Sequence, residues 1–252
     1  MKILFTICGR AGSKGIKNKN IKNFLGAPLP YYSLAAIELY LNKNKDIDAD
    51  VVLNTDSEEL IELFRINKIR KTDIIKRSKE LSSDSASKIA VILDCLVQME
   101  QKNNCKYDMV VDLDITSPLR TVNDISNLIK KQIETKCDVA FSVTTARRNP
   151  YFNMVMKKGK GYKRVIETQF NARQEAPEIF DMNASMYAYL PQYLKTGKGV
   201  LDGYCEIIEM YDTGVLDLDH ENDFELMEVI GDYIFKTKSE FNEIRDFVID
   251  AN

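Results

Sequence analysis

Short apolar runs alternate with longer amphipathic segments along this chain, which predicts strands and helices in turn. The apolar runs predict strands at Ile3–Ile7, Asp50–Asn54, Asp73–Lys76, Met109–Leu113, Val139–Val143, Met186–Leu190 and Glu206–Met210. Helical spacing of apolar residues predicts helices near Tyr31–Leu41, from Ser57, up to about Glu100, through Ile125–Ile133, and at Glu221–Phe235 and Ser239–Ile249. Strands followed by helices imply right-handed crossovers, so we expect an α/β fold with a mostly parallel sheet covered on both faces.

Cap-forming residues predict where several of these helices begin. Ser57, followed by two glutamates, suits the start of one helix, and Asp84 or Ser85 suits the start of the next. Thr121 or Asn123 is expected to cap the helix after the central strand.

Residues 146–182 interrupt the alternation of strands and helices. The segment is polar and holds two prolines, and two closely spaced glycines follow Lys157-Lys158. This pattern predicts a hairpin extension whose return strand is Tyr162–Ile166, and such an extension often covers a partner or a substrate.

Length and composition favour one domain over residues 1–252, with the extension inserted in it. No run approaches the roughly 18 to 20 apolar residues of a membrane span, so we expect a cytoplasmic protein with no membrane partner. The net charge of −3 and the lack of a basic helix disfavour nucleic acid as a partner. Five scattered cysteines without CxxC spacing indicate reduced thiols.

A glycine-rich, cationic loop follows the first predicted strand within Ile3–Asn20 (ILFTICGRAGSKGIKNKN). Glycines let main-chain N–H groups approach a ligand, and Arg and Lys add positive charge, so the loop suits a polyphosphate. The loop matches neither the Walker motif nor the dinucleotide fingerprint, and an ordinary solvated loop is the alternative. Its position favours the first interpretation, since ligands of open α/β sheets bind beyond the carboxyl ends of the strands.

Asp217 and Asp219, within Leu-Asp-Leu-Asp, are the candidate metal ligands. Alternation along a strand would place both carboxylates on one face, about 7 Å apart, where they could bind one hard divalent cation. The alternative is an acidic segment that complements the N-terminus of the following helix. A polyphosphate loop and a carboxylate pair support each other, because Mg²⁺ bridges phosphates and protein carboxylates.

Other polar groups allow both a functional and a structural interpretation. Asp112 and Asp114 also alternate, so they could form a second acidic pair at the same sheet edge, whereas turn chemistry explains the residues up to Arg120. His220, the one histidine, lacks a nucleophile partner in any motif and is left out of the site. The remaining candidates are Arg77, Ser83, Asp84 and Ser87 near a predicted helix start, and Arg173, Gln174 and Asn183 on the irregular segment.

Several of these motifs, in this order, resemble the acylneuraminate cytidylyltransferases, also called CMP-sialic acid synthetases. The resemblance rests on RAGSKGIKNKN, RSKELSSDSAS, DITSPLRT, RNPYFNMV, the stretch from Asn183 to Tyr187, and LDLD, and it covers most of the chain. It implies a three-layer α/β/α nucleotidyltransferase domain of Rossmann-like type whose inserted segment makes a homodimer.

The resemblance also implies roles for individual residues. Arg10, Ser13 and Lys14 would hold the CTP triphosphate, and Gly12, Lys19 and Asn20 would complete the nucleotide loop. Arg77 and the turn with Ser83, Asp84 and Ser87 would lie at the cytosine and ribose. Asp217 and Asp219 would bind Mg²⁺, and Arg10, Lys14 and Asp219 would act in catalysis. The residues implied at the sugar acid are Asp114, Thr116, Ser117, Arg120, Phe152, Arg173, Gln174 and Asn183.

Three positions depart from the sialic acid enzymes. Asp114-Ile115 stands where Gln-Pro is usual, Lys88 where Ser is common, and Phe152 where a sugar-binding Lys is frequent. The segments PYFNMV and VDLDITSPLR are more similar to those of enzymes for legionaminic or pseudaminic acid. The expected reaction is therefore attack of the anomeric hydroxyl of a nine-carbon 2-keto sugar acid on the α-phosphorus of CTP. The alternatives are another acid, such as an eight-carbon sugar acid or a phosphonate, and a non-catalytic nucleotide-binding module.

Overall fold

A seven-stranded sheet forms the centre of the molecule in the computed structural model, which describes residues 1–12, 15–83, 86–169, 173–213, 218 and 220–251. The strand order is β11-β7-β10-β6-β1-β4-β5, and only β10 runs antiparallel to its neighbours. The strands are β1 (Lys2–Cys8), β4 (Asp48–Thr55), β5 (Asp73–Lys76), β6 (Met109–Leu113), β7 (Val139–Thr145), β10 (Phe180–Tyr189) and β11 (Cys205–Glu209). The mostly parallel sheet predicted from the sequence is confirmed.

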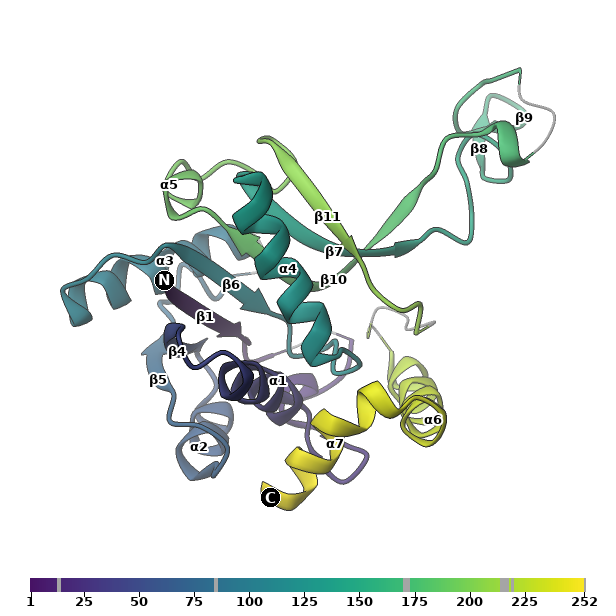
Figure 1. The fold of residues 1–252 in the computed structure, drawn as a ribbon. Coiled ribbons are helices and arrows are strands. Elements are labelled where there is room, and N and C mark those ends of the chain that lie inside the picture. Colours follow the sequence, from purple (N-terminus) through teal and green to yellow (C-terminus); the bar gives the residue numbers. More distant parts are fainter. Residues whose placement is uncertain (13–14, 84–85, 170–172, 214–217, 219, 252) are drawn as a thin grey trace.

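Helices cover both faces of this sheet (Figure 1). The helices are α1 (Leu29–Lys43), α2 (Glu58–Ile66), α3 (Lys88–Asn103), α4 (Val122–Thr135), α5 (Pro191–Leu194), α6 (Glu221–Thr237) and α7 (Ser239–Ala251). Alternation along β1 assigns the faces, because Phe5 packs with the cluster that holds α1 and α4, whereas Leu4 packs with the cluster under α3 and α5. The result is the expected three-layer α/β/α arrangement.

The helix starts test the cap predictions. Ser57 accepts a hydrogen bond from Leu60 N and begins α2, and Thr121 forms a capping box with Asp124 at α4, as expected. The prediction of Asp84 or Ser85 for α3 is wrong: the hydroxyl of Ser87 accepts from Ala90 N, and the helix begins at Lys88. Lys88 is therefore the first residue of α3, and its side chain contacts Asp112 and Asp114.

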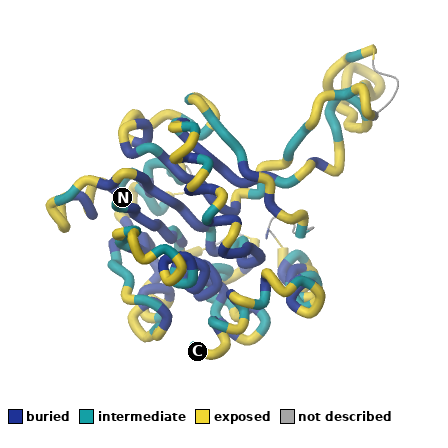
Figure 2. The backbone as a smooth tube through the Cα atoms, viewed as in Figure 1, coloured by how far each residue is buried: buried dark blue, intermediate teal, exposed yellow. Residues whose placement is uncertain are grey.

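Residues 147–179, within the connection from β7 to β10, are named the arm here. It carries the hairpin β8 (Val155–Lys158) and β9 (Gly161–Arg164) and the short helix η2 (Arg173–Glu175), and it extends away from the sheet (Figure 1). The hairpin residues are almost all exposed, in contrast to the buried central strands (Figure 2). The expected hairpin is confirmed, and its role in dimerisation stays a prediction.

Short elements complete the fold. They are η1 (Lys19–Ile21), β2 (Asn23–Phe24) and β3 (Ala27–Pro28), which lead from the glycine loop into α1. No helix in the described ranges is long and apolar enough to cross a membrane.

Candidate active site at the carboxyl ends of the central strands

The glycine loop, residues 9–18, leaves the carboxyl end of β1 and is tied to its neighbour β4. Gly9 N donates to Asn54 O at 3.2 Å, and Ala11 N donates to Asp56 Oδ1 at 2.8 Å. A Cβ on Gly9 would lie 2.8 Å from Leu60 Cδ2, so glycine lets the chain leave the strand at this point. The start of the loop is therefore held in place, while Ser13 and Lys14 lie outside the described residues.

Two parts of the site that lie far apart in the sequence meet at Leu218. The Lys19 ammonium donates a 2.7 Å hydrogen bond to Leu218 O, and Asn20 Nδ2 donates to Arg10 O at 3.0 Å. Leu218 stands between Asp217 and Asp219 in the sequence, and those two candidate metal ligands lie outside the described residues. Lys19, directly after the glycine loop, and Leu218 are therefore neighbours.

A polar cavity of about 380 Å³ adjoins this meeting point. Leu218 lines it, together with Thr116, Ser117, Asn183 and Ser185. Asn183 lies where β10 breaks its register against β7, and its Oδ1 accepts from Ser142 Oγ at 2.6 Å and from Ser185 N at 3.2 Å. The irregular strand thus turns polar side chains and main chain toward a space that suits a small polar ligand.

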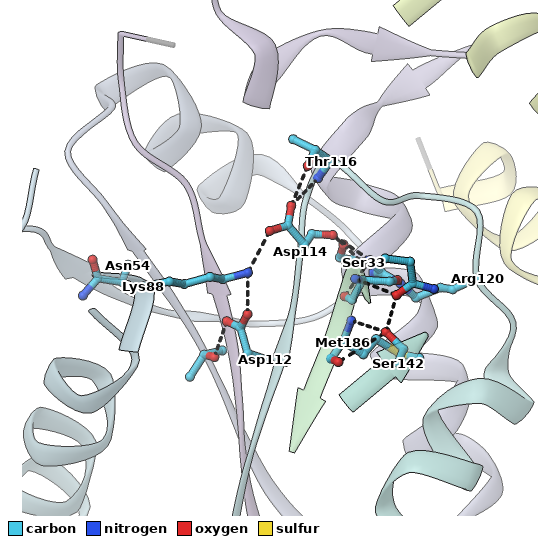
Figure 3. A network of polar contacts seen from close by, with 12 residues as sticks. Ser33, Asn54, Lys88, Asp112, Asp114, Thr116, Arg120, Ser142 and Met186 are labelled. Carbon is cyan, nitrogen blue, oxygen red and sulfur yellow. Dashed lines mark hydrogen bonds and ion pairs between the residues drawn. The ribbon is translucent and has the colours of Figure 1, made fainter. Parts of the chain in front are cut away.

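Asp114 is held by charge from one side and by its own turn from the other (Figure 3). Lys88 Nζ lies 2.7 Å from Asp114 Oδ2 and 2.8 Å from Asp112 Oδ2. Thr116 donates to Asp114 Oδ1 from its main-chain N at 2.8 Å and from its hydroxyl at 2.7 Å. Burial opposes ionisation of Asp114, but Lys88 and Thr116 outweigh it and lower the pKa of this carboxyl to about 2.

Arg120 lies inside the protein, with 1% of its surface exposed. Its guanidinium donates to Ser33 Oγ at 2.7 Å, to Asp114 O at 2.6 Å and to Ser185 Oγ at 3.3 Å (Figure 3). Burial lowers the pKa of Arg120 to about 10. Arg120 thus supports the cavity wall from behind, and a direct contact with the sugar acid stays a prediction.

The residues predicted at the base and ribose lie along the end of β5 and before α3. Arg77 is buried and holds Asn54 through Nε to Oδ1 at 2.8 Å and Nη2 to the main-chain O at 2.9 Å. Ser83 Oγ donates to Glu80 O at 3.0 Å, and Ser87 caps α3. Asp84 lies outside the described residues. Nucleotide contacts from this group stay predictions.

The arm carries three residues predicted at the sugar acid. Phe152 lies in a turn closed on Asn149 O, and Gln174 is exposed within η2, which begins at Arg173. Neither Phe152 nor Gln174 lines the cavity of its own chain. Contact of these arm residues with the acceptor stays a prediction.

Lys88 and Arg147 are described residues of the site that were not among those predicted from the sequence. Lys88 was noted only as a departure from a family pattern, yet its ammonium bridges two acids at the sheet edge. Arg147, the first residue of the arm, lines the cavity and pairs with Asp212 through Nε to Oδ2 at 2.9 Å. The alternation of Asp112 and Asp114 was a signal for the first; nothing in the sequence pattern marked the second.

The sequence from residue 4 to residue 195 matches the family described as Cytidylyltransferase. This chain belongs to the cytidylyltransferase family. The chain is 34% identical to the post-translational flagellin modification protein B of Campylobacter coli over 91% of this chain and 94% of that protein. It is 32% identical to the CMP-N,N'-diacetyllegionaminic acid synthase of Campylobacter jejuni, with the same coverage. The family membership expected from the motifs is confirmed.

The fold of this cytidylyltransferase is also similar to a solved structure titled CMP:2-keto-3-deoxy-manno-octonic acid synthetase complexed with CTP. The TM-score is 0.63 at 14% identity, covering 92% of this chain and 99% of that one. At this identity the similarity supports the nucleotidyltransferase fold alone. The expected α/β nucleotidyltransferase architecture is confirmed, and the enzyme is a nucleotidyltransferase.

Proposed function

We propose that this cytidylyltransferase activates a nine-carbon, sialic acid-like 2-keto sugar acid with CTP, and that the products are the CMP-sugar and pyrophosphate. Legionaminic or pseudaminic acid is the acceptor type that we favour, and bacterial surface glycans are the expected destination of the product. The relative named as a CMP-N,N'-diacetyllegionaminic acid synthase supports this choice of substrate class.

One observation carries the proposal: Lys19, which follows the glycine loop, donates a hydrogen bond to Leu218, and Leu218 also lines the polar cavity. A triphosphate on the loop would therefore lie beside the cavity that receives the acceptor. In-line attack needs the acceptor hydroxyl next to the α-phosphorus, and the contact at Leu218 supports that proximity.

The reaction forms a bond from the anomeric oxygen to the α-phosphorus and breaks the bond from the α-phosphorus to the bridging oxygen of pyrophosphate. Arg10 and Lys14 neutralise the charge that develops on the phosphates, and the main-chain N–H groups of the loop orient these phosphates. Asp219 takes the proton of the attacking hydroxyl. Thr116, Ser117 and Asn183 provide hydrogen-bonding groups for an acceptor in the cavity.

Mg²⁺ is the cofactor that we propose, held by Asp217 and Asp219. Within the described ranges, no group of three or more His, Cys, Asp and Glu side chains could hold a metal ion. Leu218 accepts a hydrogen bond from Lys19, next to the glycine loop, and its two sequence neighbours are the proposed metal ligands. This supports a metal ion that binds both these carboxylates and the phosphates, since Mg²⁺ prefers hard oxygen ligands. When bound, Mg²⁺ supplies charge neutralisation at the phosphates.

A homodimer is the assembly that we propose. The arm exposes Val155, Met156 and Tyr162, with 66%, 47% and 73% of their surfaces accessible, and an isolated two-stranded hairpin is marginally stable in water. The arm is also cationic, whereas α6 carries five acids and an exposed stripe that includes Val229 and Tyr233. Opposite charge and exposed apolar surface on both elements favour contact between arm and α6 of two copies.

A substrate panel tests the function. Nine-carbon and eight-carbon sugar acids and a phosphonate are each incubated with CTP, UTP or ATP, with and without Mg²⁺, and pyrophosphate release is measured. We expect turnover only with CTP, Mg²⁺ and a nine-carbon acid. Preference for the eight-carbon acid or the phosphonate would overturn the acceptor class. Near-normal turnover by both Lys14→Ala and Asp219→Asn would overturn the assigned roles.

A further inference from the structure

Lys88 is a cation in a place that its own helix does not favour. It is the first residue of α3, directly after the Ser87 cap, where the helix dipole disfavours positive charge. Its ammonium instead reaches two carboxylates at the end of the central strand β6, at 2.8 Å from Asp112 Oδ2 and 2.7 Å from Asp114 Oδ2 (Figure 3). The position of Lys88 is therefore explained by the acids and not by the helix.

Asp112 depends on this ammonium. Its side chain is fully buried, and Oδ1 accepts a 2.7 Å hydrogen bond from Thr6 Oγ1 on the neighbouring strand. Oδ2 is buried, and the Lys88 ammonium, 2.8 Å away, is the partner that compensates its charge among the described residues. A buried carboxylate without compensation is costly, and it would attract any cation that can reach it.

The two acids and Lys88 form a site of the kind that a divalent cation occupies. Two carboxylate oxygens face one positive centre, and 36% of the Lys88 side chain is accessible to solvent. Burial works against the charged form, but the two carboxylates outweigh it and raise the pKa of Lys88 well above its ordinary value. The Lys88 ammonium also lies over the Tyr187 ring, 5.6 Å from its centroid, which adds a cation–π attraction.

We propose that Lys88 is a built-in counter-ion that fills the place of a divalent cation between Asp112 and Asp114, and that it thereby positions the acceptor cavity. Two residues link Lys88 to the cavity. Asp114 accepts a hydrogen bond from the ammonium at Oδ2 and from Thr116 N at Oδ1, and Thr116 lines the cavity. Lys88 is thus a positioning residue for the cytidylyltransferase reaction, and this second acidic pair needs no metal.

Lanthanide binding tests the counter-ion role without any substrate. Tb³⁺ is titrated into wild type, Lys88→Ala and Lys88→Arg, and its emission is excited through tyrosine, since the chain has 12 Tyr and no Trp and Tyr187 lies beside the site. We expect Lys88→Ala to bind one more Tb³⁺ per chain than wild type. Lys88→Arg and the double variant Lys88→Ala/Asp114→Asn should not gain this ion.

Lys102→Ala is the matched control, because Lys102 lies on the same helix and pairs with Asp73 at 2.7 Å on the surface. It should bind Tb³⁺ as wild type does. Wild-type stoichiometry in folded Lys88→Ala would overturn the counter-ion role. If Lys88→Ala folds only when Tb³⁺ is present, the role is supported. If it stays unfolded with Tb³⁺ and Lys88→Gln folds without gaining an ion, the role is overturned.

Kinetics test the positioning role separately. We expect Lys88→Ala to raise the KM for the sugar acid roughly 10- to 100-fold, with a much smaller change in the KM for CTP, because the disturbed turn faces the acceptor. Lys88→Arg should recover most of this loss. An unchanged acceptor KM in a folded Lys88→Ala would overturn the positioning role. These results are distinguishable from failure of the proposed acceptor, since the Tb³⁺ measurement requires no turnover.

Discussion

The guanidinium of Arg120 donates a 2.6 Å hydrogen bond to the main-chain oxygen of Asp114 and so holds this turn from inside the protein. Lys88 also holds Asp114, with its ammonium 2.7 Å from Oδ2. The turn that shapes the cavity is therefore fixed between two cations, one buried and one partly exposed. The positive charges of both residues offset the negative charge that Asp114 carries at the edge of the cavity.

Replacing Arg120 by Lys should destabilise the protein. Lys cannot reproduce the fork that reaches Ser33 and Asp114 together, so buried acceptors would lose their donors, at a cost of about 2 to 4 kcal/mol in the free energy of unfolding. Urea unfolding measures this change. The control is Arg65→Lys, which alters a surface pair 3.8 Å from Glu62 and should change stability by less than about 0.5 kcal/mol. Equal effects of the two substitutions would contradict the role of Arg120.

Gly12→Ala should weaken nucleotide binding in this cytidylyltransferase. Gly12 has φ of 69°, and a Cβ added to it would meet no atom within 4 Å, so the substitution strains the backbone without a clash, by roughly 1 kcal/mol. Gly159 in the arm has φ of 65° and the same open space, which makes Gly159→Ala a matched control. Both variants should lose similar stability in urea unfolding.

Of these two variants, only Gly12→Ala should raise the KM for CTP, because only Gly12 lies in the glycine loop that we propose for the triphosphate. Steady-state kinetics with varied CTP measure the effect. A similar KM for CTP in the two variants would argue against the loop as the triphosphate site.

Asp114 should contribute to stability in a pH-dependent way. Its folded pKa of about 2 lies below its ordinary value, so the contribution is present above about pH 4 and is lost as the pH falls toward 2. The shift corresponds to roughly 2 kcal/mol. Urea unfolding of wild type and Asp114→Asn from pH 6 to pH 2 measures it. The difference between the two proteins should shrink by this amount below pH 4, and a difference that does not change with pH would refute the prediction.

Tyr162→Asp should weaken the proposed dimer. The side chain is exposed on β9, and an added negative charge would oppose contact with the acidic helix α6 of a second copy. Sedimentation velocity over a range of concentrations measures the assembly. Leu201→Asp is the control, since Leu201 is 65% exposed but lies outside the arm and α6. A monomeric wild type, or equal dissociation by both variants, would count against the arm as the dimer contact.

The local features that the sequence predicted well are those set by nearby residues. Ser57 and Thr121 cap their helices because a cap bond closes over three residues, and the strand Met109–Leu113 is buried along its whole length. The start of α3 was predicted wrongly because its sequence offers several cap residues in succession. The helix begins at Lys88, and the Lys88 side chain also reaches Asp112 and Asp114.

The sequence alone determined the alternation of strands and helices, the hairpin within the arm, the cationic glycine loop and the family. Only the tertiary structure decided that Lys19 meets Leu218, that Arg120 faces inward, and that Lys88 neutralises two acids 24 and 26 residues further along the chain. The physical reason is that strand and helix patterns arise from neighbouring residues, whereas a buried charge is satisfied by whatever the sheet order places beside it. In this protein the strand order β6-β1-β4 brings the ends of these strands, and the residues that follow them, next to one another.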